Sequence, residues 1–177
     1  MSIYLDAAAT ANCNEKDSTI IDEMTKAMRE SWQNPSSLYA TNVKEVINKC
    51  RKQVAKFIGA KSDEIYFTSG ASESNNCAIK GWVDKYRFYG YSTVNIITTP
   101  IEHKSIMNAL QNPYLGANVR YCEVDEYGLV DCQYLQRLLT YYEGEPILVS
   151  VALANNEIGT LQNIKEISKL VHSYGCV

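Results

Sequence analysis

The sequence has no long apolar run, and no window comes near the about 18 uninterrupted apolar residues that a membrane-spanning helix requires. Its first six residues contain no basic stretch followed by an apolar one, unlike a secretory signal peptide. Basic residues are not in excess either, because 17 Lys and Arg stand against 20 Asp and Glu, for a net charge of −3. Nucleic acids and membranes are therefore not expected as partners, and we expect a cytoplasmic protein.

Histidine and closely spaced cysteine are also scarce. The chain has two histidines, and its six cysteines include no Cys-x-x-C pair. A disulfide framework or a zinc site needs closer ligand spacing than this. We therefore expect no metal site and a set of scattered free thiols, namely Cys13, Cys50, Cys77, Cys122, Cys132 and Cys176.

The 177 residues, 46% hydrophobic and 21% charged, are enough for a globular domain with a real core. Apolar spacing predicts helices over 17–32 and 43–58, with a break at 34–37 and a stop at Gly59. Further strands are expected at 64–68, 94–98, 119–124 and 147–153, and further helices after 69–72 up to 89 and at 103–111, 132–142 and 164–174. This alternation predicts an α/β fold, a largely parallel sheet with helices on both faces.

Polar residues follow three of the predicted strands, at the edge where such sheets bind ligands. The first group is 68–75, between a strand and a helix. Gly70 permits a tight turn, and a helix N-terminus with the hydroxyls of Ser69 and Ser72 suits a phosphate group. Taken alone, the same residues are explained better by a serine that caps the helix, because capping serines are common.

The second group is Glu102 and His103, which suit acid/base chemistry, metal ligation or stacking on a ring. A helix start with an acidic first turn explains them as well. The third group, 154–160, has two adjacent asparagines, Glu157 and a glycine after an apolar strand. A turn explains the asparagines and the glycine, but it gives no reason for Glu157.

Taken together, these segments resemble the cysteine desulfurases of the class V aminotransferase family, which use pyridoxal 5'-phosphate (PLP). The resemblance runs from Ile3 to the end of the chain. It implies an incomplete PLP-binding large domain of the aspartate aminotransferase-like fold, with an N-terminal segment and helix at 1–33 and the phosphate-binding half at 34–177. The matching stretches are 4–10, 34–37, 67–75, 78–81, 102–104 and 154–160.

The resemblance also implies roles for individual residues. Ala71 and Ser72 would bind the PLP phosphate, and Asn156 would hydrogen-bond the phenolic oxygen of the ring. His103 would lie against the ring and act as a catalytic residue. The family further implies L-cysteine as substrate, a sulfur-acceptor protein and a homodimer with its sites near the interface. The residues expected near the substrate are Ala8, Ala9 and Thr10.

The chain departs from the family in what it lacks. In the family, the Asp at the pyridinium nitrogen, the Schiff-base lysine and the nucleophilic Cys all follow the segment that matches Val177, and no lysine or cysteine here stands in those motifs. We therefore expect the N-terminal part of an enzyme that converts L-cysteine to L-alanine with sulfur transfer, inactive as an isolated chain. The alternatives are a non-catalytic remnant that binds a phosphate ligand or a full-length partner, and another class V enzyme such as an aminotransferase.

Overall fold

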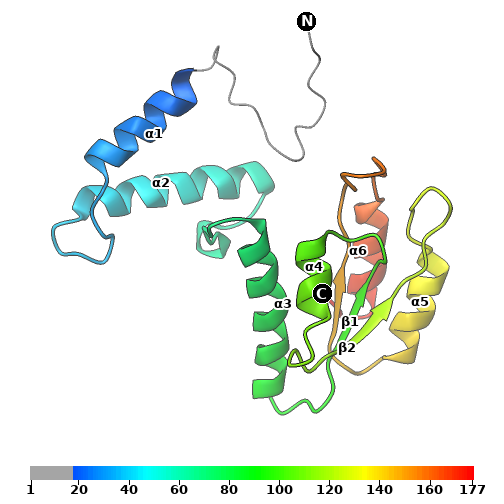
Figure 1. The fold of residues 1–177 in the computed structure, drawn as a ribbon. Coiled ribbons are helices and arrows are strands. Elements are labelled where there is room, and N and C mark those ends of the chain that lie inside the picture. The colour runs from blue at the N-terminus through cyan, green and yellow to red at the C-terminus, as the bar shows by residue number, and fades with distance from the viewer. Residues whose placement is uncertain (1–17) are drawn as a thin grey trace, which may run out of the picture. The chain divides into compact units, whose positions relative to one another are not determined.

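The computed structural model describes residues 18–177. The chain divides into two compact units, one that ends at Phe67 and one from Thr68 to Val177 (Figure 1). Each unit is described by itself below. Among the described residues, no helix is both long enough and apolar enough to cross a membrane.

The N-terminal unit contains the two helices that the apolar spacing predicts. These are α1 (Ser18–Glu30) and α2 (Thr41–Ile58). Gly59 ends α2 in the left-handed conformation, with φ of 72°, and its N–H donates to the Ala55 carbonyl. Only glycine adopts this conformation freely, so its position ends the helix where the sequence places the stop.

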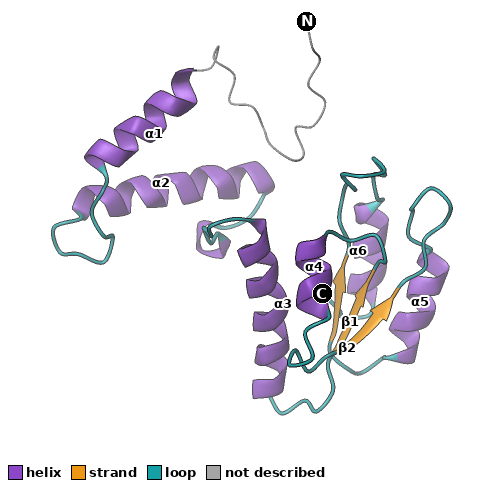
Figure 2. Cartoon of the chain, in the orientation of Figure 1, coloured by secondary structure: helices purple, strands orange, loops and turns teal. Residues whose placement is uncertain are grey.

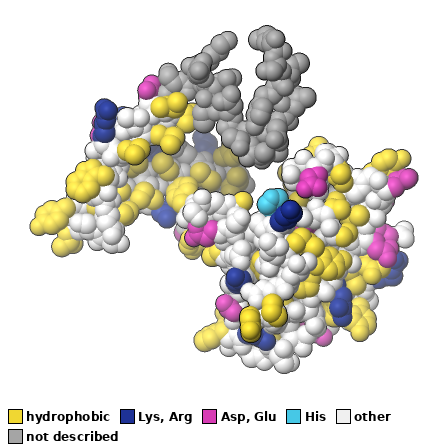
Figure 3. Space-filling model, in the orientation of Figure 1, with side chains coloured by type: hydrophobic (Ala, Val, Ile, Leu, Met, Phe, Trp, Pro, Cys, Tyr) yellow, Lys and Arg dark blue, Asp and Glu magenta, His cyan; other side chains and the backbone are white. Residues whose placement is uncertain are grey.

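Many apolar side chains of these two helices are exposed in the described chain. Met28 of α1 is 76% exposed and Phe57 of α2 is 90% exposed, whereas Val43 and Ala55 of α2 are buried. Figure 3 shows hydrophobic side chains at the surface over the N-terminal helices. The helical periodicity was therefore predicted correctly, but much of the apolar stripe has no covering partner within residues 18–177.

The strand predicted over 64–68 is wrong. A short 3-10 helix, η1 (Ser62–Glu64), occupies its start, and Ile65 is extended but unpaired. Within residues 18–177 no strand lies beside this segment. The Ile65 carbonyl instead accepts a hydrogen bond of 3.1 Å from Arg51 Nε on α2. An apolar, β-branched segment forms a strand only where a neighbouring strand takes up its backbone groups.

The C-terminal unit is a three-stranded parallel sheet covered by four helices (Figure 2). Its elements are α3 (Ala71–Phe88), β1 (Asn95–Thr98), α4 (Lys104–Leu110), β2 (Asn118–Tyr121), α5 (Cys132–Tyr141), β3 (Ile147–Ser150) and α6 (Ile164–Ser173). The strand order is β2-β1-β3, which makes β1 the central strand. The predicted α/β fold is confirmed, although β2 and β3 are each shorter than the sequence pattern suggested.

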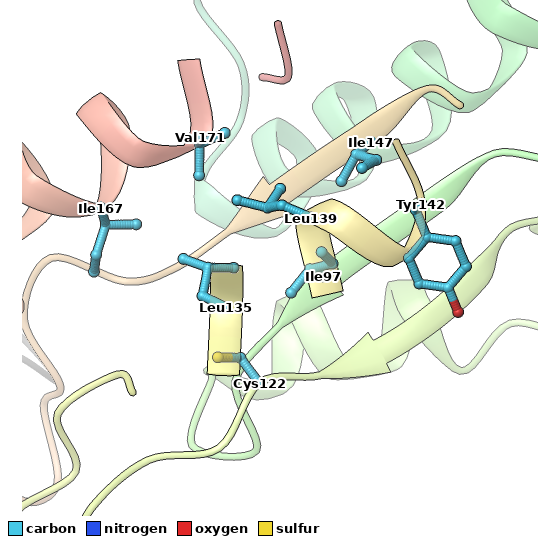
Figure 4. Close-up of a cluster of buried hydrophobic side chains, with 8 residues drawn as sticks. All are labelled: Ile97, Cys122, Leu135, Leu139, Tyr142, Ile147, Ile167 and Val171. Atoms are coloured by element: carbon cyan, nitrogen blue, oxygen red, sulfur yellow. The ribbon is translucent and has the colours of Figure 1, made fainter. Parts of the chain in front are cut away.

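The two faces of the sheet each have their own core. Ile96 packs with side chains of α3 and α4, and its neighbour Ile97 packs with side chains of α5 and α6. Figure 4 shows Leu135 and Leu139 of α5 in the second cluster with Ile97. Successive strand residues point to opposite faces of a sheet. Because helices cover both faces here, Ile96 and Ile97 are both apolar.

The last residue of the chain adds to the open edge of β3. The N–H of Val177 donates to the Ile147 carbonyl at 3.2 Å, and its carbonyl accepts from the Val149 N–H at 2.6 Å. Val177 thus bonds to Ile147 and Val149, the two residues that flank Leu148, as a residue of a parallel strand does. The outer edge of β3 is therefore geometrically competent to bind a further parallel strand.

Candidate functional site

The first turn of α3 presents unpaired backbone donors. No side chain caps this helix, and its N-cap Gly70 has extended backbone. The N–H groups of Ala71, Ser72 and Glu73 have no acceptor within residues 18–177. These groups lie at the positive end of the helix dipole, so the turn is suited to bind an anionic group.

Side-chain hydrogen bonds between residues 68–69 and 73–74 stabilise this turn. The Glu73 carboxylate accepts from Ser69 N at 2.7 Å and from Ser69 Oγ at 2.5 Å. Both bonds favour the ionised form and lower the pKa of Glu73. Thr68 Oγ1 lies 2.7 Å from Ser74 Oγ. The hydroxyl of Ser72 makes no such bond in the described chain, so neither serine caps the helix and Ser72 keeps its donor for a ligand.

His103 is joined to this turn through one serine. His103 is the N-cap of α4, and its Nδ1 accepts from Ser105 N at 3.1 Å and lies 2.8 Å from Ser105 Oγ. Ser105 Oγ in turn accepts from Asn75 Nδ2 of α3 at 2.8 Å. Because Nδ1 accepts, the neutral ring carries its proton on Nε2, and the exposed ring is held in a defined orientation.

Glu102, in contrast, has a structural role. Its Oε1 accepts from Thr99 Oγ1 at 2.9 Å and from Ala152 N at 3.0 Å. The carboxylate therefore ties the end of β1 to the segment that follows β3. The Glu102 carboxylate makes these bonds and none to His103 in the described chain, so the two residues do not form an acid/base pair. Among the described residues no group of His, Cys, Asp and Glu could hold a metal ion.

The two adjacent asparagines have different surroundings. Asn155 Oδ1 accepts from Glu157 N at 2.8 Å and Ile158 N at 3.0 Å, and its Nδ2 donates to the Ile101 carbonyl at 2.8 Å. Asn155 thus forms the turn that the sequence suggested. The Asn156 side chain is exposed and has no partner in the described chain, so it is available to a ligand.

A cavity of about 490 Å³ lies between the two loops, at the carboxyl ends of β1 and β3. It is lined by residues 100–104 and 155–158, so His103 and Asn156 share it. Ala71 and Ser72 do not line this cavity, and α3 is linked to His103 only through the Asn75–Ser105 bond. The predicted substrate-proximal residues Ala8, Ala9 and Thr10 lie outside the described residues.

Two residues of this arrangement escaped the sequence analysis. Asn75 falls inside a matched stretch, but nothing in the sequence distinguishes its amide from that of Asn76. Ser105 follows the Glu-His pair and gives no signal at all. Both act through hydrogen bonds between two helices, which local sequence patterns do not encode.

The described cysteines differ in how far they are buried. Burial raises the pKa of Cys122 to about 12, with the negative charge of Asp131 adding to it. A raised pKa keeps the thiol protonated at neutral pH, and the thiolate is the reactive form. We expect iodoacetamide at pH 8 to modify the exposed Cys50 and Cys77 of the folded chain and to leave Cys122 unmodified.

Peptide mass spectrometry checks this expectation, with the denatured chain as the control in which all three thiols react. Alkylation of Cys122 at the rate of Cys50 in the folded chain would contradict it.

Comparisons with known proteins match nearly the whole chain. The family model for aminotransferase class-V matches residues 3–177. A mitochondrial cysteine desulfurase of Drosophila melanogaster is 41% identical over 177 residues, which cover 97% of this chain and 36% of that protein. Cysteine desulfurase IscS of Clostridium botulinum is 40% identical over 173 residues, which cover 95% and 41%. The chain thus spans about two fifths of the length of these curated relatives.

Solved structures of similar proteins have the same fold as this chain. A NifS-like protein superposes with a TM-score of 0.83 at 33% identity and covers 98% of this chain and 46% of its own. SspA in complex with cysteine gives a TM-score of 0.84 at 30% identity, with 99% and 49% covered. The predicted large-domain fold is therefore that of known relatives. The cytoplasmic location remains a prediction, because relatives named as mitochondrial and bacterial proteins match equally well.

Proposed function

Because this chain belongs to the class-V aminotransferase family, we propose that it forms the phosphate- and ring-binding part of a PLP-dependent cysteine desulfurase. The names of the matched relatives support L-cysteine as the substrate, with L-alanine as product and sulfur passed to an acceptor protein. The homodimer belongs to the same proposal. The conversion of L-cysteine to L-alanine with sulfur transfer is proposed for the whole protein, because the chain covers about two fifths of its relatives' length.

The observation that carries the proposal is the first turn of α3. Three adjacent N–H groups without acceptors, from Ala71 to Glu73, and the free Ser72 hydroxyl offer several donors to a phosphate. Glu73 itself is turned back onto Ser69, which keeps its carboxylate hydrogen-bonded at the turn. These donors suit the phosphate of PLP.

The cavity at the strand ends supports the ring of the same cofactor. Asn156, with a free amide, would donate to the phenolic oxygen, and the oriented imidazole of His103 would lie against the ring. Bound PLP would supply the electron sink for chemistry at the amino acid. This chain's residues bind and orient it, and Nε2 of His103 is the nearby group that can hold or release a proton.

A binding experiment with the 177-residue chain tests the proposal. We expect noncovalent binding of PLP in a fluorescence titration. Binding of pyridoxal, which lacks the phosphate, should be about 10- to 100-fold weaker, since hydrogen bonds to a charged group contribute about 1.5–3 kcal/mol. We also expect no sulfide release from cysteine by this chain. Equal affinity for pyridoxal and PLP would contradict the phosphate site.

A chimaera tests the reaction itself. The chain would replace the matching 173 residues of the Clostridium botulinum relative, which retains its own C-terminal part. We expect the chimaera to hold PLP and to release sulfide from cysteine. A chimaera that holds PLP but only exchanges amino groups with a keto acid would favour the aminotransferase alternative.

A further inference from the structure

The turn at 125–130 packs directly against the loop that carries Asn156. Val124 and Val130 form an antiparallel bridge that closes this turn. Gly128 within it is buried and has φ of +79°. A Cβ atom there would lie 2.7 Å from Ile158 Cδ1 and 3.2 Å from Thr160 Oγ1. The positive φ favours glycine at this position, and any larger residue would also have to displace the end of the Ile158 side chain.

Two side chains fasten the loop to this turn. Thr160 Oγ1 donates to the Tyr127 carbonyl at 2.5 Å. Buried Gln162 donates through Nε2 to the Gly128 carbonyl at 2.5 Å and accepts through Oε1 from the Val130 N–H at 3.0 Å. The amide of Gln162 is thus bonded at both its oxygen and its nitrogen, as a buried amide requires.

The same residues close the loop upon itself. The Gln162 N–H donates to the Leu153 carbonyl, and the Asn155 N–H donates to the Thr160 carbonyl, both at 2.9 Å. Ala154 and Leu161 form a bridge between the two arms. Asn156 lies at the exposed end of this closed loop. Residues 160 and 162 do not line the cavity, but they hold the two arms of the loop and so act on the position of Asn156 together with the Asn155 side chain.

We propose that Thr160 and Gln162 are positioning residues that hold Asn156 in the cavity it shares with His103. The inference rests on the proposed function for the identity of the ligand. A ligand that meets a loop already fixed does not lose affinity to ordering it, so loosening the loop should weaken ring binding. Phosphate binding at α3 involves no residue of this loop and should not change.

The test is Thr160→Val, which removes the hydroxyl and keeps the side-chain shape. Thr140→Val is the matched control, because its hydroxyl bonds Tyr174 OH at 3.0 Å on the helical face. The first readout is amide hydrogen exchange at Glu157 and Ile158, the donors to Asn155. The second is the affinity of the 177-residue chain for PLP and for inorganic phosphate. Gln162→Leu is a second, more severe variant.

We expect Thr160→Val to speed exchange at both amides and to weaken PLP about 2- to 10-fold, the range of one lost hydrogen bond. Phosphate affinity and the Thr140→Val chain should match the unmodified protein. Unchanged exchange would overturn the proposal, and so would faster exchange with unchanged PLP affinity. Failure of the unmodified chain to bind PLP would reject the proposed function instead, and hydrogen exchange would still decide whether the loop is held. Should Gln162→Leu not fold, the Thr160→Val result stands alone.

Discussion

Ser72→Asp is expected to abolish measurable PLP binding while leaving the melting temperature of the chain unchanged or slightly higher. Ser72 lies in the first turn of α3, where a carboxylate interacts favourably with the helix dipole. The same charge would repel a phosphate and would occupy the free N–H groups that the phosphate needs. Binding should therefore be lost without a loss of stability, which a general folding defect cannot produce.

Gln133→Asp is the control for this variant. Gln133 is the second residue of α5, as Ser72 is the second residue of α3, so the charge and helix position are the same. Titration calorimetry with PLP and with inorganic phosphate should show binding unchanged for Gln133→Asp. Retained phosphate affinity in Ser72→Asp would place the anion site elsewhere.

Leu139→Ala is expected to cost about 2–5 kcal/mol of the free energy of unfolding, the usual range for a buried leucine. Leu139 is fully buried between α5 and the sheet, in the cluster that also holds Ile97 and Leu135 (Figure 4). Its removal would leave a cavity that the surrounding strands cannot fill.

Urea denaturation measures the effect, with Leu153→Ala as the matched control because Leu153 is 62% exposed. The control should lie within about 0.5 kcal/mol of the unmodified chain. A loss below about 1 kcal/mol for Leu139→Ala would mean that the site collapses to fill the space.

The sequence predicts most of the C-terminal unit because its elements are locally encoded. The helix over 132–142 begins at Asp131, whose side chain accepts from two backbone N–H groups, and the one over 164–174 begins at Asn163 in a similar way. The predicted strand at 64–68 fails for the opposite reason. A strand depends on a neighbour elsewhere in the chain, and within residues 18–177 Arg51 takes the place of that neighbour at Ile65.

Two of the three predicted polar groups lie at the ends of strands, near β1 and β3, whereas 68–75 follows no strand within residues 18–177. The sequence did not predict which residue of each group has a structural role. Asn155 and Asn156 are identical in type and adjacent, yet only Asn155 meets the Ile101 carbonyl. Glu102 is committed to Ala152, which is distant in the sequence. Such roles depend on pairs of residues brought together by the fold, and a single sequence has no local signal for them. The PLP-binding roles of Ala71, Ser72, His103 and Asn156 remain predictions.

The central place of β1 also bears on how this unit folds. Its pairing with β2 closes a shorter stretch of chain than its pairing with β3, and the entropy lost on closing a loop grows with its length. We expect α3, β1, α4 and β2 to assemble first and β3 to join a strand pair already formed. The loop with Asn156 follows β3, so the ring-binding side of the cavity would be completed last, after the phosphate turn of α3 is in place.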